Sequence, residues 1–380
     1  MKTQNVDVRA FRTRREFLKT TGLIAASVAG VAVPSSPGAP PQAAASSSSG
    51  AAGNSRAGQS TPGSGANFDK WKDRKVLELA ARPQVSFVPE HAERHTIYSL
   101  ALMSITLHYW NGNIYGRGVQ YPLNEPVPAA APGRMADDYI GHNIAALMAD
   151  GDGHIIDFDF NHNEIFNSSV EHAESRLLRR VFSLSQLHDG WDLGRKLQDQ
   201  HYASELKKAS LYTTLESCAQ CSGIMALAQL KQVIFLQTDP GQYFVGNIMR
   251  NMTEGTYLQS PAPIPAKWFD LPHFASLDAS YEAFRMRPQN KENAMVLDQN
   301  GNVTDQSFTT SITSFLCTKA ARDIFSRGAQ EFAAFRVQHP NWKPDAINST
   351  QLANAAVFKE CQHFVDYAIT EARRGTPHRP

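Results

Sequence analysis

Hydrophobic and polar positions follow two different periods along this chain, and the change of period separates helices from strands. Residues 89–110 begin with proline and early glutamates and carry a broad apolar face, which predicts a long helix. Residues 143–149 read as a buried strand, the sequence DGDG at 150–153 supplies a turn, and residues 154–160 alternate with a period of two. These last three segments predict a β-hairpin.

Strands alternate with helices after the hairpin, and this alternation predicts an α/β sandwich. A Pro-rich stretch then precedes a helical C-terminal part. The elements predicted after the hairpin are a helix over 170–184, a strand over 211–215, a helix over 218–230, a strand over 233–236, and helices near 314–335 and 351–373. One further helix is predicted near the N-terminus, over 70–82.

The second strand of the hairpin has one apolar and one polar face. Ile156, Phe158 and Phe160 alternate with Asp157 and Asp159. The two carboxylates could serve as metal ligands, but the pattern is typical of a half-buried strand whose polar face is solvated. The sequence favours this second interpretation.

The N-terminus has the features of a targeting segment. Residues 13–19, TRREFLK, resemble the twin-arginine export motif, and a modestly apolar run follows over 20–33. No later apolar stretch reaches the length of a membrane span. We therefore expect the twin-arginine machinery to export the folded chain to the periplasm or the extracellular space. The mature protein is expected to have no membrane segment.

Composition adds limits on the partners. The chain has 380 residues, 42% of them hydrophobic, with a formal net charge of +1. This balance argues against a nucleic-acid partner, which would favour a basic excess. Residues 34–66 contain almost only Pro, Ala, Ser, Gly and a few polar residues, and such a composition predicts a disordered linker.

Four residues have the chemistry of a catalytic metal site. Cys218 and Cys221 are three positions apart at the start of a predicted helix, where the helix dipole favours thiolates. His172 on an earlier predicted helix can complete three zinc ligands, which leaves one position for water. Glu174, two residues beyond the histidine, can then move protons as a general acid and base.

The sequences His172-Ala-Glu174 and Cys218-x-x-Cys221 resemble the motifs of the zinc-dependent cytidine and deoxycytidylate deaminase superfamily. Within it, residues 140–240 look most like the branch of tRNA adenosine deaminases and guanine deaminases. The resemblance implies a three-layer α/β/α sandwich with a mixed central sheet, zinc held by the histidine and both cysteines, and Glu174 as proton shuttle. It also implies that Asn161 and the backbone amide of Ala173 contact the substrate.

The resemblance implies a domain organisation and a substrate class. We expect a signal peptide at 1–45, a linker at 46–67, N-terminal helices and an insertion at 68–139, the zinc deaminase core at 140–240 and a C-terminal extension at 241–380. The expected substrate is a small aminated heterocycle, such as a nucleobase or nucleoside. Because relatives are often dimers, a homodimer is compatible with the sequence.

The chain departs from the family pattern before its first cysteine, where Ser217 replaces a proline. Serine also suits a helix start, so the geometry can survive, but substrate contacts at this position are open. A second His-Ala-Glu sequence, beginning at His91, opens the long helix without a preceding hairpin. We interpret it as a surface helix start.

Four alternatives remain at this stage. A Cys-x-x-Cys after a strand is also typical of exported thiol oxidoreductases. A structural zinc site would need a fourth ligand, and Cys317 and Cys361 are isolated in predicted helices, where they are core residues or one disulfide. A deaminase-like domain could bind without catalysis, or a deaminase could act on tRNA or another nucleic acid. Arg176, Arg179 and Arg180 form the densest basic cluster near the site for that last case.

Overall fold

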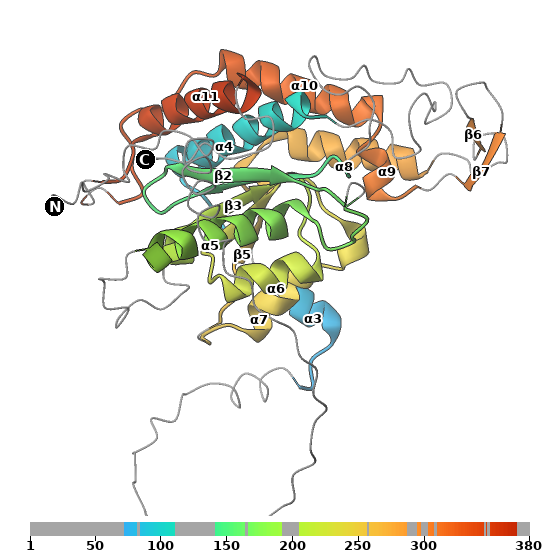
Figure 1. Ribbon diagram of the computed structural model, residues 1–380, viewed down its shortest axis with the longest axis horizontal. Helices are drawn as coiled ribbons and strands as arrows, with labels where there is room; N and C mark the ends of the chain where they lie inside the picture. Colours follow the sequence, from blue (N-terminus) through green and yellow to red (C-terminus); the bar gives the residue numbers. More distant parts are fainter. Residues whose placement is uncertain are drawn as a thin grey trace, which may run out of the picture.

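A mixed five-stranded sheet forms the centre of the computed structural model, in the order β2-β1-β3-β4-β5 (Figure 1). The structure describes residues 72–81, 84–110, 141–163, 166–191, 205–256, 258–286, 295–297, 303–307, 310–345, 347 and 350–370. The predicted signal peptide, linker and insertion at 111–138 lie outside these residues. The strands are β1 (Ala145–Ala149), β2 (Ile155–Phe160), β3 (Ser210–Thr213), β4 (Gln232–Phe235) and β5 (Ala262–Pro265).

The sheet changes from antiparallel to parallel at β3. Strand β1 pairs antiparallel with both β2 and β3, whereas β3, β4 and β5 run parallel to one another. The β1–β2 hairpin turns at the DGDG sequence, where Asp150 Oδ1 accepts hydrogen bonds from the backbone amides of Asp152, Gly153 and His154. The predicted hairpin is confirmed.

Helices cover both faces of the sheet, which confirms the predicted three-layer α/β/α fold (Figure 1). Helix α4 (Pro89–His108) packs against β1 and β3 on one face, and α10 (Lys319–Ala334) and α11 (Asn354–Thr370) pack over α4. On the other face, α5 (Ala173–Trp191) packs against β1, β2 and β3, and α6 (Ala219–Leu227) packs against α5. The C-terminal helices thus form an extra layer over α4.

The polar face of β2 is buried, so the interpretation as a solvated strand face is wrong. Asp157 and Asp159 lie under α5, where the Arg180 guanidinium contacts Asp157 Oδ2 at 2.6 Å and also pairs with Asp159. Phe158 contributes its carbonyl oxygen to the same guanidinium. A cation from a helix therefore balances the carboxylates, and these residues form no metal site within the described part of the chain.

Strand β5 was not predicted, because its sequence, APIP, contains two prolines. Proline cannot donate to a strand ladder and is confined to edges and strand starts. Here β5 is one of the two edge strands, and the Ala262 amide donates to Lys231 O of the neighbouring chain segment. Pro263 and Pro265 alternate with the residues whose amides face β4, so the ladder loses nothing.

The remaining described elements refine the predicted bounds or add to them. Helix α3 (Val76–Ala80) is shorter than the helix predicted over 70–82, and the helix predicted near 314–335 is divided into α9 (Ile312–Phe315) and α10. The unpredicted elements are α7 (Val245–Met252), α8 (Pro272–Arg285), β6 (Met295–Leu297), β7 (Val303–Ser307) and the 3₁₀ turns η2 (Glu205–Lys208), η3 (Pro240–Gln242) and η4 (Ala266–Phe269).

Two remaining sequence questions concern membranes and cysteines. Among the described residues, no helix combines the length and apolarity that crossing a bilayer requires. Cys317 and Cys361 are both buried, and no disulfide joins them. Of the two interpretations, the structure supports core cysteines.

Candidate metal centre and active site

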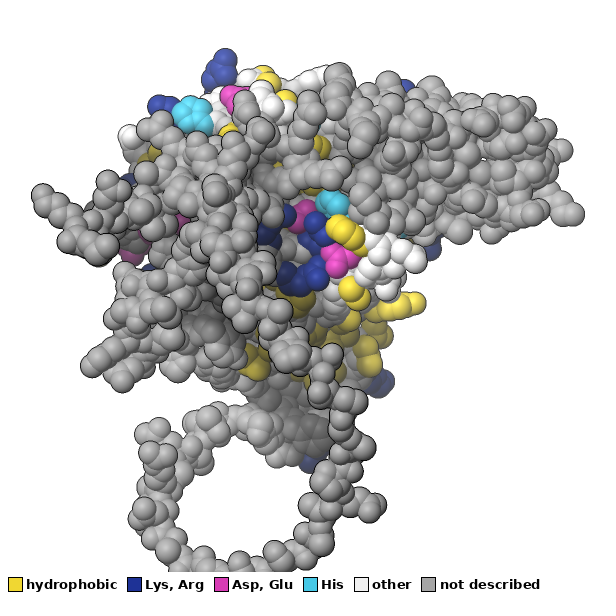
Figure 2. All heavy atoms as spheres, viewed as in Figure 1, with side chains coloured by type: hydrophobic (Ala, Val, Ile, Leu, Met, Phe, Trp, Pro, Cys, Tyr) yellow, Lys and Arg dark blue, Asp and Glu magenta, His cyan; other side chains and the backbone are white. Residues whose placement is uncertain are grey.

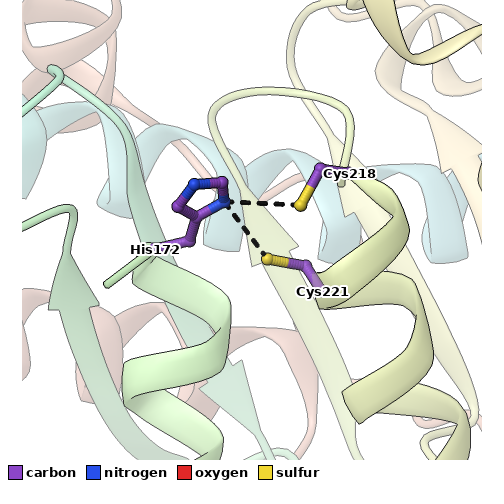
Figure 3. Close-up of side chains that lie close together, drawn as sticks. All are labelled: His172, Cys218 and Cys221. Atoms are coloured by element: carbon purple, nitrogen blue, oxygen red, sulfur yellow. Dashed lines mark hydrogen bonds between the residues drawn. The ribbon is translucent and has the colours of Figure 1, made fainter. Parts of the chain in front are cut away.

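Three potential metal ligands meet where the first turns of α5 and α6 face each other (Figure 3). His172 directly precedes α5, and its carbonyl accepts the amide of Arg176, so it caps the helix rather than lying within it. Cys218 is the extended N-cap residue of α6, and Cys221 lies in the first turn. His172 Nδ1 is 3.4 Å from Cys218 Sγ and 3.6 Å from Cys221 Sγ.

This geometry fits zinc. With ordinary Zn–S and Zn–N bond lengths, a tetrahedral zinc ion holds a sulfur and a nitrogen ligand roughly 3.5 Å apart. Both distances from the imidazole agree with this value, and all three ligand atoms lie within 4.8 Å of one another. One imidazole and two thiolates are also a preferred donor set for zinc, and three protein ligands leave the fourth position open.

The electrostatics of the two cysteines favour a cation at this place. A hydrogen bond from Cys221 lowers the pKa of Cys218 to about 4, and His172 acts in the same direction. The same contact, together with burial, raises the pKa of the Cys221 thiol. The pair therefore shares one proton, and a divalent cation would supply the charge that lets both sulfurs ionise.

Glu174 is buried beside the three ligands. Its Oε1 accepts a hydrogen bond from Ser217 Oγ at 2.9 Å and a longer one from Thr213 Oγ1 at 3.4 Å. The thiol of Cys221 contacts its other oxygen, Oε2, at 3.4 Å. Burial raises the pKa of the Glu174 carboxyl. A buried carboxyl with a raised pKa, held next to a metal position, suits proton transfer near neutral pH.

Ser217 therefore contributes directly to the site, although it departs from the family pattern. Its hydroxyl is the closest hydrogen-bond donor described for the Glu174 carboxylate. A proline at this position would have no such donor. The replacement thus exchanges a rigid residue for one that holds the carboxylate.

Asn161 and Ala173, both predicted to contact the substrate, lie against each other. Asn161 lies directly after β2, is buried, and its Oδ1 accepts the backbone amide of Ala173 at 2.7 Å. In this structure the Ala173 amide is thus engaged by Asn161. The bond ties the end of β2 to the first residue of α5, and so fixes the position of His172. Contact of either residue with a substrate remains a prediction.

Three further titratable groups lie around the site, and the sequence assigned none of them a role there. Burial lowers the pKa of His142 to about 4, with a further contribution from His172. Burial raises the pKa of Glu216 to about 7, although a hydrogen bond from the Asp239 backbone opposes this shift. The Asp239 amide donates to Glu216 Oε2 at 3.1 Å. Glu216 follows the end of β3 and Asp239 follows the end of β4, and adjacent parallel strands end at the same edge.

The second His-Ala-Glu sequence is not a metal site, but it is also not a surface helix start. Glu93 is buried and accepts hydrogen bonds from the backbone amides of Gln338 and His339. His91 is half-buried and stacks on His95 with ring centroids 4.6 Å apart. This part of α4 is therefore packed against the C-terminal extension.

The basic cluster of α5 is largely neutralised. Arg180 pairs with the carboxylates of β2, and Arg176 and Arg179 both pair with Glu171. Figure 2 shows positive and negative side chains intermingled in the middle of the described part of the viewed face. The described surface here is mixed rather than uniformly basic.

Residues 128–237 match the family model described as the cytidine and deoxycytidylate deaminase zinc-binding region. The match includes β1, β2, α5, β3, α6 and β4, together with all three metal ligands and Glu174. This stretch therefore matches a deaminase zinc-binding region, and zinc is the cofactor that the His172, Cys218 and Cys221 group can hold. No curated protein matches the chain.

Three solved structures are similar to parts of the chain. One, from a study of tRNA:A34 deaminases, is 21% identical over 32% of this chain and 82% of its own, with a TM-score of 0.23. A guanine deaminase from Nitrosomonas europaea is 16% identical over 51% of this chain and 86% of its own, with a TM-score of 0.26. A diaminohydroxyphosphoribosylaminopyrimidine deaminase/reductase from Thermotoga maritima is 16% identical over 50% of this chain and 42% of its own, with a TM-score of 0.26. Similarity at this level does not extend to a substrate.

Proposed function

We propose that this chain is an exported, zinc-dependent hydrolytic deaminase that releases ammonia from a small aminated heterocycle, such as a nucleobase or nucleoside. The observation that carries the proposal is the position of Glu174. Its buried carboxylate lies against Cys221 and Ser217, directly beside a His/Cys/Cys group with zinc geometry. A structural zinc site has no need of a buried carboxylate at this position.

The residues divide into metal-holding and proton-moving roles. His172, Cys218 and Cys221 would hold zinc, which would supply the Lewis acidity that activates water for attack on the substrate. Glu174 accepts a proton at a carboxylate oxygen and delivers it to the amino group that departs as ammonia. Ser217 and Thr213 hold the carboxylate in place for both transfers, because both hydroxyls donate to Oε1.

A small-molecule substrate is supported by the charges around the site. A nucleic-acid substrate would need cations that are free to contact phosphates. The three arginines of α5 are instead paired with Glu171, Asp157 and Asp159. The net charge of +1 points in the same direction.

Export is supported by the TRREFLK motif and the apolar run that follows it. Folded export also suits this chemistry, because zinc bound in the cytoplasm would protect the two thiols from oxidation afterwards. Replacing Arg14 and Arg15 together by lysine should retain the protein in the cytoplasm of the producing cell. Equal amounts of both forms outside the cytoplasm would contradict twin-arginine export.

Ammonia release from a panel of aminated bases and nucleosides tests the activity directly. The protein is purified with zinc and compared with Glu174→Gln, which keeps the shape of the side chain. One substrate class should release ammonia, and the rate should fall by about 10²–10⁴-fold in the variant, the usual contribution of general acid–base catalysis. Zinc content, measured on both proteins, should be equal.

The panel also separates this proposal from its rivals. Activity on a tRNA or single-stranded nucleic acid alone would assign the nucleic-acid alternative. If the zinc-bound protein releases ammonia from no member of the panel, the alternative of a non-catalytic binding domain would be supported. Thiol–disulfide exchange that persists in Glu174→Gln would support the oxidoreductase instead.

A further inference from the structure

A small basic pocket lies on the face of the sheet opposite the metal centre. The pocket has a volume of about 60 Å³ and is lined by residues of α4, of the β1–β2 turn and of the starts of β3 and β4. Ser210 and Gln232, the first residues of β3 and β4, contribute to it, whereas Cys218 follows the other end of β3. The pocket is therefore separate from the catalytic site.

Three cations line this pocket, and they have no acidic partner within the described residues. Arg94 is buried and contacts only neutral acceptors, the carbonyl of Leu352 and the Asn354 side chain. Lys208 and Lys231 form no ion pair in this part of the chain. Buried or clustered cations normally have a counter-charge, so this arrangement is unusual.

One acidic group, Asp150, lines the pocket, and one of its two carboxylate oxygens is already engaged by the backbone. Asp150 Oδ1 accepts three backbone hydrogen bonds in the β1–β2 turn. The two glycines of the turn, Gly151 and Gly153, leave room for the side chains of Lys208 and Arg94. A Cβ at Gly153 would collide with the Arg94 guanidinium, and one at Gly151 would collide with the Lys208 side chain. The turn therefore lets the side chains of Arg94 and Lys208 approach its backbone closely, while Asp150 Oδ1 stays hydrogen-bonded within the turn.

His95 adds a buried ring nitrogen that has no hydrogen-bond partner among the described residues. Only 1% of the residue is exposed, and the side chain lines the pocket. Its Nδ1 is 2.9 Å from the Tyr212 hydroxyl, whereas its Nε2 has no hydrogen-bond partner in the part of the chain that the structure describes. With Tyr212 donating to Nδ1, Nε2 carries the hydrogen and can donate. A buried donor without a partner is costly, and a bound group would satisfy it.

We propose that this pocket binds a tetrahedral oxyanion of the size of phosphate, held by Arg94, Lys208 and Lys231 and by the Nε2–H of His95. A pocket of about 60 Å³ accommodates such an ion or a phosphomonoester end group, but not a whole nucleoside. Charge-assisted hydrogen bonds from several cations give such a site its affinity.

The neutral state of the neighbouring imidazoles agrees with this arrangement. Burial lowers the pKa of His91 to about 4, and Lys231 and Arg94 contribute to the shift. Burial likewise lowers the pKa of His95. The pocket thus contains fixed cations and neutral imidazole donors, which together favour an anion over a cation.

The pocket borders the strand that also supports the catalytic carboxylate. Successive residues of a strand point to opposite faces. Tyr212 contacts His95 on one face of β3, and its neighbour Thr213 contacts Glu174 on the other. An ion bound at His95 would therefore be linked to Glu174 through two consecutive residues of β3, Tyr212 and Thr213.

Titration of the zinc-loaded full chain with inorganic phosphate, at constant ionic strength with chloride, tests the proposal. Calorimetry should give saturable binding, and the ¹⁵N resonance of His95 Nε2 should shift. The double variant Lys208→Glu/Lys231→Glu should weaken phosphate binding by about tenfold or more. Both lysines are exposed, so the variant should fold, which its circular dichroism spectrum checks.

The matched control is Lys359→Glu, an exposed lysine on α11 that does not line the pocket. It should bind phosphate as the parent chain does. Ribose 5-phosphate, with ribose for comparison, separates two sources of the ion. Tighter binding of the ester than of phosphate would assign a phosphomonoester, and the reverse would assign free phosphate. No saturable binding, no shift at His95, or equal weakening by Lys359→Glu would overturn the proposal.

Discussion

Ser217 Oγ donates a hydrogen bond to Glu174 Oε1 over 2.9 Å, and this contact links the residue before Cys218 to the carboxylate that we propose moves protons. Both groups are buried. The contact is closer than that from the Thr213 hydroxyl, at 3.4 Å, so Ser217 is the nearer of the two side-chain donors to this oxygen. Ser217 therefore acts as a positioning residue.

Replacing Ser217 by alanine should lower kcat and leave KM nearly unchanged. A hydrogen bond to a charged group contributes about 1.5–3 kcal/mol, which corresponds to about 10–100-fold in rate if it is needed only in the transition state. Steady-state kinetics on the substrate found by the ammonia panel measures both constants. Ser217→Thr keeps the hydroxyl and should recover most of kcat. Equal loss in the alanine and threonine variants would point to packing instead.

Removing zinc should lower thermal stability in a reversible way. A ligand that binds only the folded state stabilises it by about 2.7 kcal/mol at a concentration 100 times its Kd. The Tm, measured by calorimetry in zinc-buffered solutions, should rise with free zinc. Cys221→Ser should abolish this dependence, because it removes one of the three ligands.

Cys361→Ala is the control for the zinc experiment. It deletes another fully buried thiol, on α11, and should lower the Tm by a constant amount at every zinc concentration. A zinc response that survives in Cys221→Ser would remove that cysteine from the ligand set.

The ion cluster between β2 and α5 should contribute strongly to folding. The Arg180 side chain is 14% exposed and pairs with Asp157, whose side chain is 1% exposed. Removing one partner of a buried pair leaves an uncompensated charge and costs about 3–5 kcal/mol. Arg180→Gln should therefore reduce the free energy of unfolding by about that amount, measured by urea denaturation.

Arg179→Gln provides the matched comparison on the same helix. Arg179 is 52% exposed and pairs with Glu171, so its loss should change the free energy of unfolding by only about 0–1 kcal/mol. Similar effects of the two substitutions would mean that burial does not govern these ion pairs.

His91 should make the protein less stable in mild acid. Its pKa is lowered to about 4, mainly by burial, so the unfolded chain binds a proton that the folded chain does not. Stability from the neutral imidazole is complete above the unfolded pKa near 6.5, and is lost as pH falls toward 4. His91→Phe keeps a ring against His95 and removes this loss.

The difference in the free energy of unfolding between His91→Phe and the parent chain should be measurable in phosphate-free buffer. At pH 5, His91→Phe should be more stable than the parent chain by about 1 kcal/mol, a value already reduced for partial exposure, and near pH 8 the difference should vanish. Urea denaturation at both pH values measures it. A stability difference that does not depend on pH would assign the effect to packing.

Several parts of this structure could be predicted because their signals are local. The hairpin and the helices after His172 and Cys218 each follow a clear period, and the two motifs fix the metal ligands. Asp157 and Asp159 were misinterpreted because their partner, Arg180, lies on the next helix and only tertiary packing brings it near.

Other features depend on contacts between distant segments and have no sequence signal. Ser217 and Glu174 are joined across two elements, and the basic pocket combines α4 with the β1–β2 turn and two strand starts. Neither Lys208 nor Lys231 stands out in a chain with 37 lysines and arginines. The His91 sequence was a false motif for zinc, yet its imidazole lines that pocket.

The prolines of β5 also determine whether another strand can pair with this edge of the sheet. Ala262 directs its amide to β4, so the next positions that face outward are Pro263 and Pro265. Neither residue has an N–H, and an incoming strand would find no donors there. The same residues that concealed β5 in the sequence thus protect this border against β-augmentation, whether by an extended peptide or in aggregation of unfolded chains.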